Sequence, residues 1–165
     1  MNDLIQAAED LSKRVDIYRA AHFAASDRLR TVHYVLGFLL IAVSAVVSGS
    51  VLQASNGNPS QALTITAGAL GTAVVVLTSV QTTFKLGERA EQHRSAAAGF
   101  GRIQRRLELF IHRRHPDTDS AWDELLAIAE DIGKVEAGAP GFLRRSYDRA
   151  RREVSAELAG KRPTP

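Results

Sequence analysis

The two sequences VHYVLGFLLIAVSAVVSGSVL (residues 32–52) and ALTITAGALGTAVVVLTSVQTTF (residues 62–84) decide the fold. No Asp, Glu, Lys or Arg occurs from residue 31 to residue 84, although charged residues make up 24% of the chain. A helix crosses the roughly 30 Å hydrocarbon core of a bilayer with about 20 apolar residues. Both sequences reach that length, so they predict a hairpin of two membrane-spanning helices.

The alternative is a hairpin buried in the core of a soluble helical bundle. Helices of soluble proteins usually keep a polar face, and the first apolar run has nothing wider than a stripe of serines. The second run is rich in threonine, but a hydroxyl can donate to a carbonyl of its own helix and is therefore tolerated in lipid. These features favour the membrane hairpin.

The segments that flank the two runs predict the orientation of the hairpin. Residues 53–61, QASNGNPSQ, carry no charge and are rich in turn-forming residues. Basic residues lie on the other side of both runs: Arg28, Arg30, Lys85, Arg89 and Arg94. By the positive-inside rule, both termini are expected in the cytoplasm and the short loop outside.

The composition limits the other classes of function. A length of 165 residues fits one module rather than two enzymes. The absence of cysteine excludes disulfides, thiolate metal sites and cysteine nucleophiles. The net charge of +3 is too small to indicate nucleic-acid binding. A cleaved signal peptide is not expected, because the first apolar run starts late and is too long for one.

Apolar or small residues recur at alternating steps of four and three on both sides of the hairpin, a pattern typical of helix–helix contact. Before the first span they are Leu4, Ala8, Leu11, Val15, Tyr18, His22, Ala25 and Leu29. After the second span they are Leu86, Ala90, His93, Ala97, Phe100, Gln104, Leu107 and Ile111. The first pattern runs toward the membrane and the second away from it, so we expect the two helices to pair antiparallel as a stalk. We call its central positions the stalk seam: Tyr18, His22, Ala90, His93, Ala97 and Phe100.

The remaining sequence predicts two more helices, at about residues 120–134, capped by Asp119 or Ser120, and at about residues 142–159. Arginines on the last helix either lie on anionic lipid headgroups or form a solvated face. The expected fold is therefore all-α, with long antiparallel cytoplasmic helices below a two-span hairpin. As one module it comprises a cytoplasmic helix 1–31, a span 32–52, an outer loop 53–61, a span 62–84, a cytoplasmic helix 85–115 and C-terminal cytoplasmic helices 116–165.

Histidines are the main candidates for a pH-sensitive or metal-binding site. His22 and His93 form either a pH-sensitive or metal-binding pair, or simply two packed side chains, and packing is the more common role. His112 and His115 lie near Asp117 and Asp119, but this cluster has no recognised ligand spacing. We therefore expect no metal site and no cofactor.

The sequence contains no catalytic motif that we recognise, so we expect no enzyme activity. Small and hydroxyl residues nevertheless share one face of each apolar run: Gly37, Ser44, Ser48, Thr64, Gly68, Thr72, Ser79 and Thr82. This face either lets helices pack closely or lines a pore. Since one hairpin has too few helices to enclose water, a pore requires several copies of the chain.

Two segments after the second span carry a family resemblance. In FKLGERAEQHRSAA (residues 84–97) an Ala and a His precede the aromatic Phe100, and in IGKVEAGAP (residues 132–140) Glu136 leads to a turn at Pro140. With the layout of helix, short-looped hairpin and cytoplasmic helices, the chain resembles the SLATT proteins. These are two-transmembrane effector domains associated with SMODS nucleotide synthases and SLOG domains in bacterial conflict systems.

The resemblance implies a pore-forming or membrane-disrupting effector of antiphage defence in the bacterial inner membrane, triggered by a nucleotide second messenger. That messenger would bind the cytoplasmic helices, or a synthase or sensor partner would relay the signal. An anion site would use arginines that otherwise form a solvated stripe: Arg102, Arg105, Arg106, Arg113 and Arg114. The alternatives are a non-conducting scaffold that recruits a soluble partner and, less favoured, a subunit of a membrane-associated enzyme.

Overall fold

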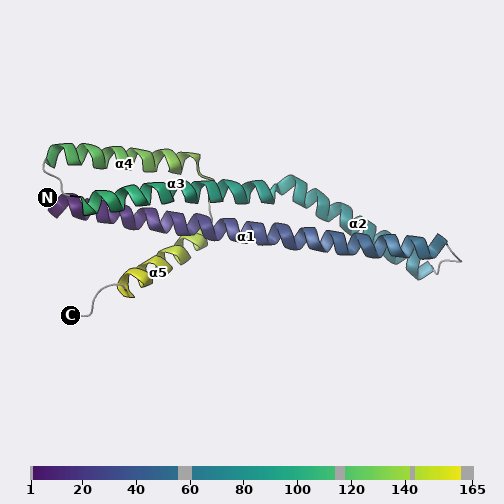
Figure 1. The fold of residues 1–165 in the computed structure, drawn as a ribbon. Coiled ribbons are helices and arrows are strands. Elements are labelled where there is room, and N and C mark those ends of the chain that lie inside the picture. The colour runs from purple at the N-terminus through teal and green to yellow at the C-terminus, as the bar shows by residue number, and fades with distance from the viewer. Residues whose placement is uncertain (1, 56–60, 114–117, 142–143, 161–165) are drawn as a thin grey trace. The chain divides into compact units, whose positions relative to one another are not determined.

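The computed structural model describes residues 2–55, 61–113, 118–141 and 144–160. Every element in these ranges is a helix, as expected (Figure 1). They are α1 (Asn2–Ser55), α2 (Gln61–Phe84), α3 (Leu86–His112), α4 (Thr118–Gly138) and α5 (Arg144–Gly160). The chain divides into two units, which we call the bundle unit (residues 1–27 and 89–165) and the hairpin unit (residues 28–88).

Several helix boundaries differ from the sequence-based expectation. The first helix continues into the first apolar run without a break and extends to Ser55, and α2 already begins at Gln61. The two helices therefore include residues at both ends of the predicted loop 53–61. The fourth helix, α4, begins at Thr118, before the two expected caps, and it ends at Gly138 rather than near residue 134. Most of the segment 132–140 is consequently helical.

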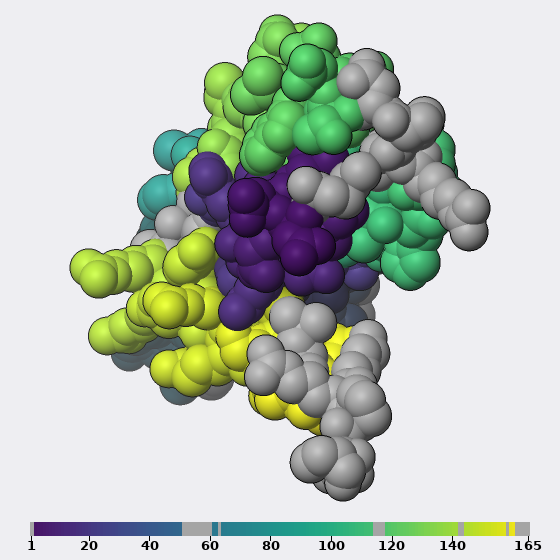
Figure 2. Space-filling model, turned by 90° about the vertical axis from the view of Figure 1, so that its left-hand side faces the viewer, coloured from purple at the N-terminus to yellow at the C-terminus, as the bar shows by residue number. Residues whose placement is uncertain are grey.

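The bundle unit has a core formed by three helices. Leu4, Ala8 and Val15 of α1 pack with buried residues of α3 and α4. The buried α3 and α4 side chains of this core are Phe100, Ile103, Leu107, Phe110, Ala121, Leu125, Ile128 and Ile132. Viewed along the bundle, the first turns of α1 (purple) lie among α3 and α4 (green) and α5 (yellow) (Figure 2).

The helices α3 and α4 approach each other closely at Gly99. A Cβ atom added at Gly99 would lie 3.2 Å from Cγ1 of Val135, which is closer than an ordinary van der Waals contact. The glycine therefore sets the spacing between the two helices, and a larger residue would force Val135 to move.

A second, smaller cluster attaches α5 to α1. Ile17 and Ala21 of α1 pack against Ala150 and Val154 of α5, with Ala20 and Tyr147 at the edge of the contact. The side of α5 that carries Tyr147, Ala150 and Val154 thus lies against α1. Its arginines remain exposed, and Arg149 forms an ion pair with Glu153 on the same helix.

The second apolar run does not continue smoothly into the following helix. Lys85, between α2 and α3, has a φ of 45°, in the left-handed region that favours glycine. Its N–H still donates to the carbonyl of Gln81, at 3.1 Å. The helix expected from residue 85 begins one residue later, at Leu86, because hydrophobic spacing does not report a single left-handed position.

Replacing Lys85 by glycine should stabilise the protein by about 1 kcal/mol, because glycine adopts a positive φ without steric cost. The measurement is the free energy of unfolding of the full chain in mixed micelles. Lys85→Ala is the matched control, since it keeps the strained backbone and loses the exposed ion pair with Glu88. An equal gain in both variants would show that the left-handed conformation is not a source of strain.

Candidate functional site

Two helical stretches are long and apolar enough to cross a membrane, Asn2–Ser50 and Thr64–His112. In each, none of the most apolar 18-residue segment is buried within the structure. A core helix of a soluble protein would bury this surface, because exposed apolar area is unfavourable in water. The exposed apolar surface fits a lipid environment and disagrees with the alternative of a buried hairpin.

Within the hairpin unit, α1 and α2 each have a half-buried stripe at helical spacing. On α1 the stripe is His33, Leu36, Gly37, Leu40, Val43 and Val47; on α2 it is Ala67, Leu70, Gly71, Val74, Leu77 and Gln81. A polar contact joins the two stripes at one end, where Nε2 of Gln81 donates to the carbonyl of His33 at 3.3 Å. These stripes are the faces on which the two helices pack.

The small and hydroxyl residues selected from the sequence lie mostly outside this packing. Gly37 is the exception, because it is half-buried, and a Cβ added there would lie 3.9 Å from Nε2 of Gln81. The other seven are exposed: Ser44 and Ser48 on α1, and Thr64, Gly68, Thr72, Ser79 and Thr82 on α2. We call the five α2 residues the hydroxyl face. Val75 is also exposed and lies on this face, at three residues after Thr72.

Three of the four hydroxyl groups of this face are hydrogen-bonded within their own helix. Thr72 donates to the carbonyl of Gly68 at 3.0 Å, Ser79 to that of Val75 at 2.8 Å, and Thr82 to that of Thr78 at 2.9 Å. The donors are therefore satisfied before any contact with lipid or another helix. Each hydroxyl oxygen keeps the capacity to accept a further hydrogen bond. The face can thus lie against lipid, against another small-residue face, or along water.

In the bundle unit, the stalk seam is formed by contacts between α1 and α3. Nδ1 of His22 lies 2.9 Å from Nδ1 of His93, and the two residues are 1% and 5% exposed. The Phe100 ring stacks on His22 and on Tyr18, with centroids 5.6 Å and 5.5 Å apart. Ala90 and Ala97 are buried one turn to either side of His93.

Burial keeps this histidine pair neutral. Desolvation, together with the facing His93 imidazole, lowers the pKa of His22 to about 4. Desolvation also lowers the pKa of His93. Within the described part of the chain, no group of three or more His, Cys, Asp or Glu side chains could hold a metal ion. His115 and Asp117 of the second histidine cluster lie outside the described residues.

Gln104 is a buried polar residue on α3, and its role was not apparent from the sequence. Its Nε2 lies 3.0 Å from Oγ of Ser12, 3.2 Å from Oδ2 of Asp16 and 3.3 Å from Oε1 of Glu108. The amide therefore places a donor among three oxygens at the α1–α3 interface.

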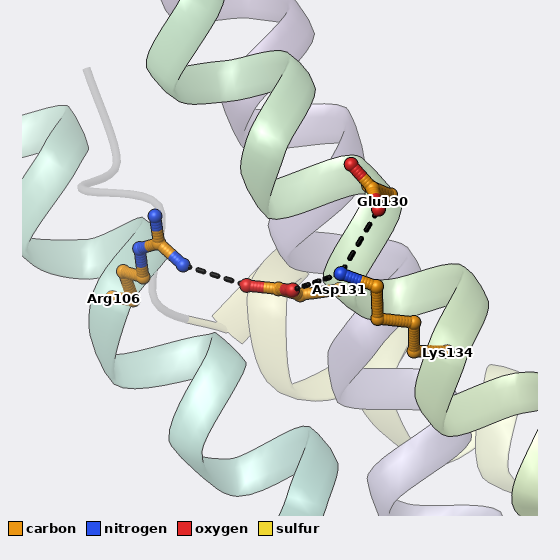
Figure 3. A network of polar contacts seen from close by, with 4 residues as sticks. All are labelled: Arg106, Glu130, Asp131 and Lys134. Carbon is orange, nitrogen blue, oxygen red and sulfur yellow. Dashed lines mark hydrogen bonds and ion pairs between the residues drawn. The ribbon is translucent and has the colours of Figure 1, made fainter.

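Two arginines of the predicted anion site have carboxylate partners on α4. Arg106 pairs with Asp131 at 2.8 Å, and Lys134 contacts both Asp131 and Glu130, at 3.3 Å and 2.9 Å (Figure 3). Arg113 pairs with Glu124. Arg102 and Arg105 are exposed on α3, and Arg114 lies outside the described residues. The structure thus divides the four described arginines between helix–helix ion pairs and the open surface.

Comparison with protein families gives one description that fits this architecture. The family model for the SMODS and SLOG-associating 2TM effector domain family 5 matches residues 5–131. This match includes both apolar runs and the stalk seam. No curated protein matches the chain, and no solved structure does.

Replacing Phe100 by alanine should destabilise the bundle unit by about 3–5 kcal/mol, because Phe100 is fully buried and stacks on both Tyr18 and His22. The readout is the unfolding free energy of the full chain in micelles. Leu109→Ala on the same helix is the control, since Leu109 is 73% exposed and its loss should change stability by about 0.5 kcal/mol or less. Similar losses for the two variants would contradict the packing of the stalk seam.

Proposed function

The chain belongs to the SMODS and SLOG-associating 2TM effector domain family 5, and from this premise we propose that it is a pore-forming effector of bacterial antiphage defence. Several copies assemble in the inner membrane and open a conduit in response to a nucleotide signal. The observation that carries this proposal is the exposed hydroxyl face of α2, which the hairpin does not use for its own packing.

The hydroxyl face supports assembly of several copies because of its chemistry. Gly68 and the hydroxyl residues around it are small enough for another helix to approach closely, and such faces are common where membrane helices associate. Two helices cannot enclose a water-filled path, so a conduit formed by this chain requires further copies. The hydroxyl oxygens that remain available as acceptors then offer the path a polar lining.

In this proposal, the bundle unit receives the signal and the chain catalyses no reaction. Both termini lie in the cytoplasm, as the basic residues flanking the apolar runs favour. A nucleotide second messenger, or the synthase or sensor that handles it, binds the bundle unit and stabilises the open packing of the assembled hairpins. The signal acts through its higher affinity for one of two packings, as any ligand-driven shift requires.

Leakage of ions and dye from anionic liposomes tests this function. The vesicles carry the purified full-length chain, and cyclic and linear nucleotides are added one at a time. We expect leakage when the correct nucleotide is added. Leakage without any nucleotide would still support pore formation. It would indicate that a partner protein controls the opening.

The opposite result would favour a different function. If the protein inserts, as verified by flotation with the vesicles, and no leakage occurs under any condition, the chain is not a pore by itself. A non-conducting scaffold that recruits a soluble partner would then be the better account. The back-bonded hydroxyls are compatible with that account, because they can also face lipid.

Gly68→Leu and Thr72→Leu should each abolish toxicity on forced expression, because a leucine fills the hydroxyl face and prevents close approach of another helix. Toxicity is measured as loss of colony formation after induction, with membrane insertion checked by fractionation. Ala69→Leu is the matched control, because Ala69 is an exposed small residue about 100° around the helix from Gly68. It should leave toxicity unchanged. Full toxicity of both test variants would remove the hydroxyl face from the mechanism.

A further inference from the structure

The His22–His93 contact constrains the number of protons that the bundle unit can hold. Two imidazole nitrogens 2.9 Å apart form a hydrogen bond only if one of them carries the proton and the other accepts it. Two neutral imidazoles satisfy this condition when they adopt different tautomers. Two imidazolium rings do not, because both Nδ1 atoms then carry protons and the rings repel each other. The observed geometry is therefore that of a pair that is not doubly protonated.

The Phe100 ring, which carries no charge, packs directly against the pair. On α1, Tyr18 and Ser26 lie about one turn to either side of His22, and on α3 Phe100 stacks on the His22 ring. From α5, Tyr147 lies against Tyr18, at 5.8 Å between centroids. Charged groups near these rings include Arg14 of α1, whose guanidinium lies over the Tyr18 ring at 5.5 Å, and Glu136 of α4, which pairs with Arg14 at 2.9 Å. Arg19 of α1 lies against Gly101, next to Phe100, and pairs with Asp16 at 3.8 Å.

The pair also joins the two helices that form the stalk seam. His22 and His93 are 71 residues apart in sequence, and each is buried at the interface that α1 and α3 share. A charge placed at this point acts directly on the contact between the two helices. Its cost is relieved if the helices separate and water reaches the imidazoles.

We propose that the His22–His93 pair is a proton-sensitive latch, which holds α1 and α3 together while it is neutral and releases them when the surrounding solution becomes acidic. This inference goes beyond the proposed pore, since it concerns the bundle unit alone and holds whether or not the hairpin conducts. It makes acidification a second input to the protein, in addition to any nucleotide signal.

The direction of the pH effect follows from the lowered pKa values. When the bundle opens, His22 changes from a pKa of about 4 to an ordinary value of ~6.5, so the open form binds more protons between these values. The closed bundle is fully favoured above about pH 6.5 and loses stability as the pH falls toward 4. From about pH 7.5 to about pH 4.5, the ratio of open to closed bundles should rise on the order of 50-fold from His22 alone.

Distance measurements between two spin labels on the full-length chain test the latch. The sequence has no cysteine, so Ala24→Cys on α1 and Arg94→Cys on α3 give two specific labelling sites, both exposed. In lipid nanodiscs, a longer distance should appear as the pH is lowered from about 7.5 to about 4.5, and it should disappear when the pH is restored. No change of the distance distribution over this range would overturn the proposal.

Two further variants separate the latch from other effects of acid. His22→Leu combined with His93→Leu replaces the pair with apolar side chains of similar size, and its distance should no longer depend on pH. His112→Gln, at an exposed histidine near the end of α3, should keep the full response. A response of the double leucine variant equal to that of the parent would assign the effect to carboxylates and refute the latch.

A measurement on the parent sequence avoids any substitution in the core. The imidazole nitrogen signals of ¹⁵N-histidine-labelled protein report protonation of each ring as the pH is lowered. We expect the two buried rings to titrate below the ordinary histidine range, together with the change in label distance. A buried ring that titrates at about 6.5 or above, with the bundle still closed, would contradict the proposal.

Discussion

The absence of charge from residue 31 to residue 84 is the constraint on which the rest of the structure depends. A charged side chain at the centre of a bilayer costs about 2.5–3.5 kcal/mol even on the most permissive scales. Several polar side chains of the hairpin have hydrogen-bond partners within it. Thr72 and Ser79 donate to their own helix, and Gln81 donates to the carbonyl of His33. The ion pairs between helices lie instead in the bundle unit, between α1 or α3 and α4.

One helix, α1, meets two different demands along its length. Its first half buries Leu4, Val15 and His22 against α3, with a second contact at Ile17 and Ala21 against α5. Its second half buries little and presents apolar side chains such as Phe38 and Ile41 outward. The backbone is helical in both halves. The side chains therefore decide whether a half packs against other helices or presents an apolar surface.

The periodicity of the sequence indicated the helices and the stalk seam, but it did not indicate the other contacts of these helices or the backbone between them. Steps of four and three identify the residues on one face, such as His22 and Phe100, but they do not reveal a second partner on another face. The contact of Ile17 and Ala21 with α5 was missed because neither residue lies on the predicted stalk pattern, and alanine gives a weak apolar signal. The left-handed Lys85 was missed because it depends on a single backbone angle.

The candidate site shows the same limit. Helical spacing groups Gly68 and Thr72, which are exposed together on α2, but it did not separate them from Gly37, which lies against Gln81 inside the hairpin. Whether a small-residue face points toward its own hairpin or away from it depends on how α1 and α2 are rotated. That rotation is fixed by larger side chains such as Leu36 and Leu70, whose spacing is no different from that of other apolar residues.

The attachment of α5 has a consequence for how the bundle unit opens locally. A cluster with two alanines, Ala21 and Ala150, at its centre buries little apolar area compared with the core around Phe100 and Leu107. Amide hydrogens of α5 will therefore exchange with solvent at a smaller opening free energy than those in the middle of α3. This helix is a separate, weakly held unit of folding, and a protease that acts on partly open molecules will cut there before it reaches the core.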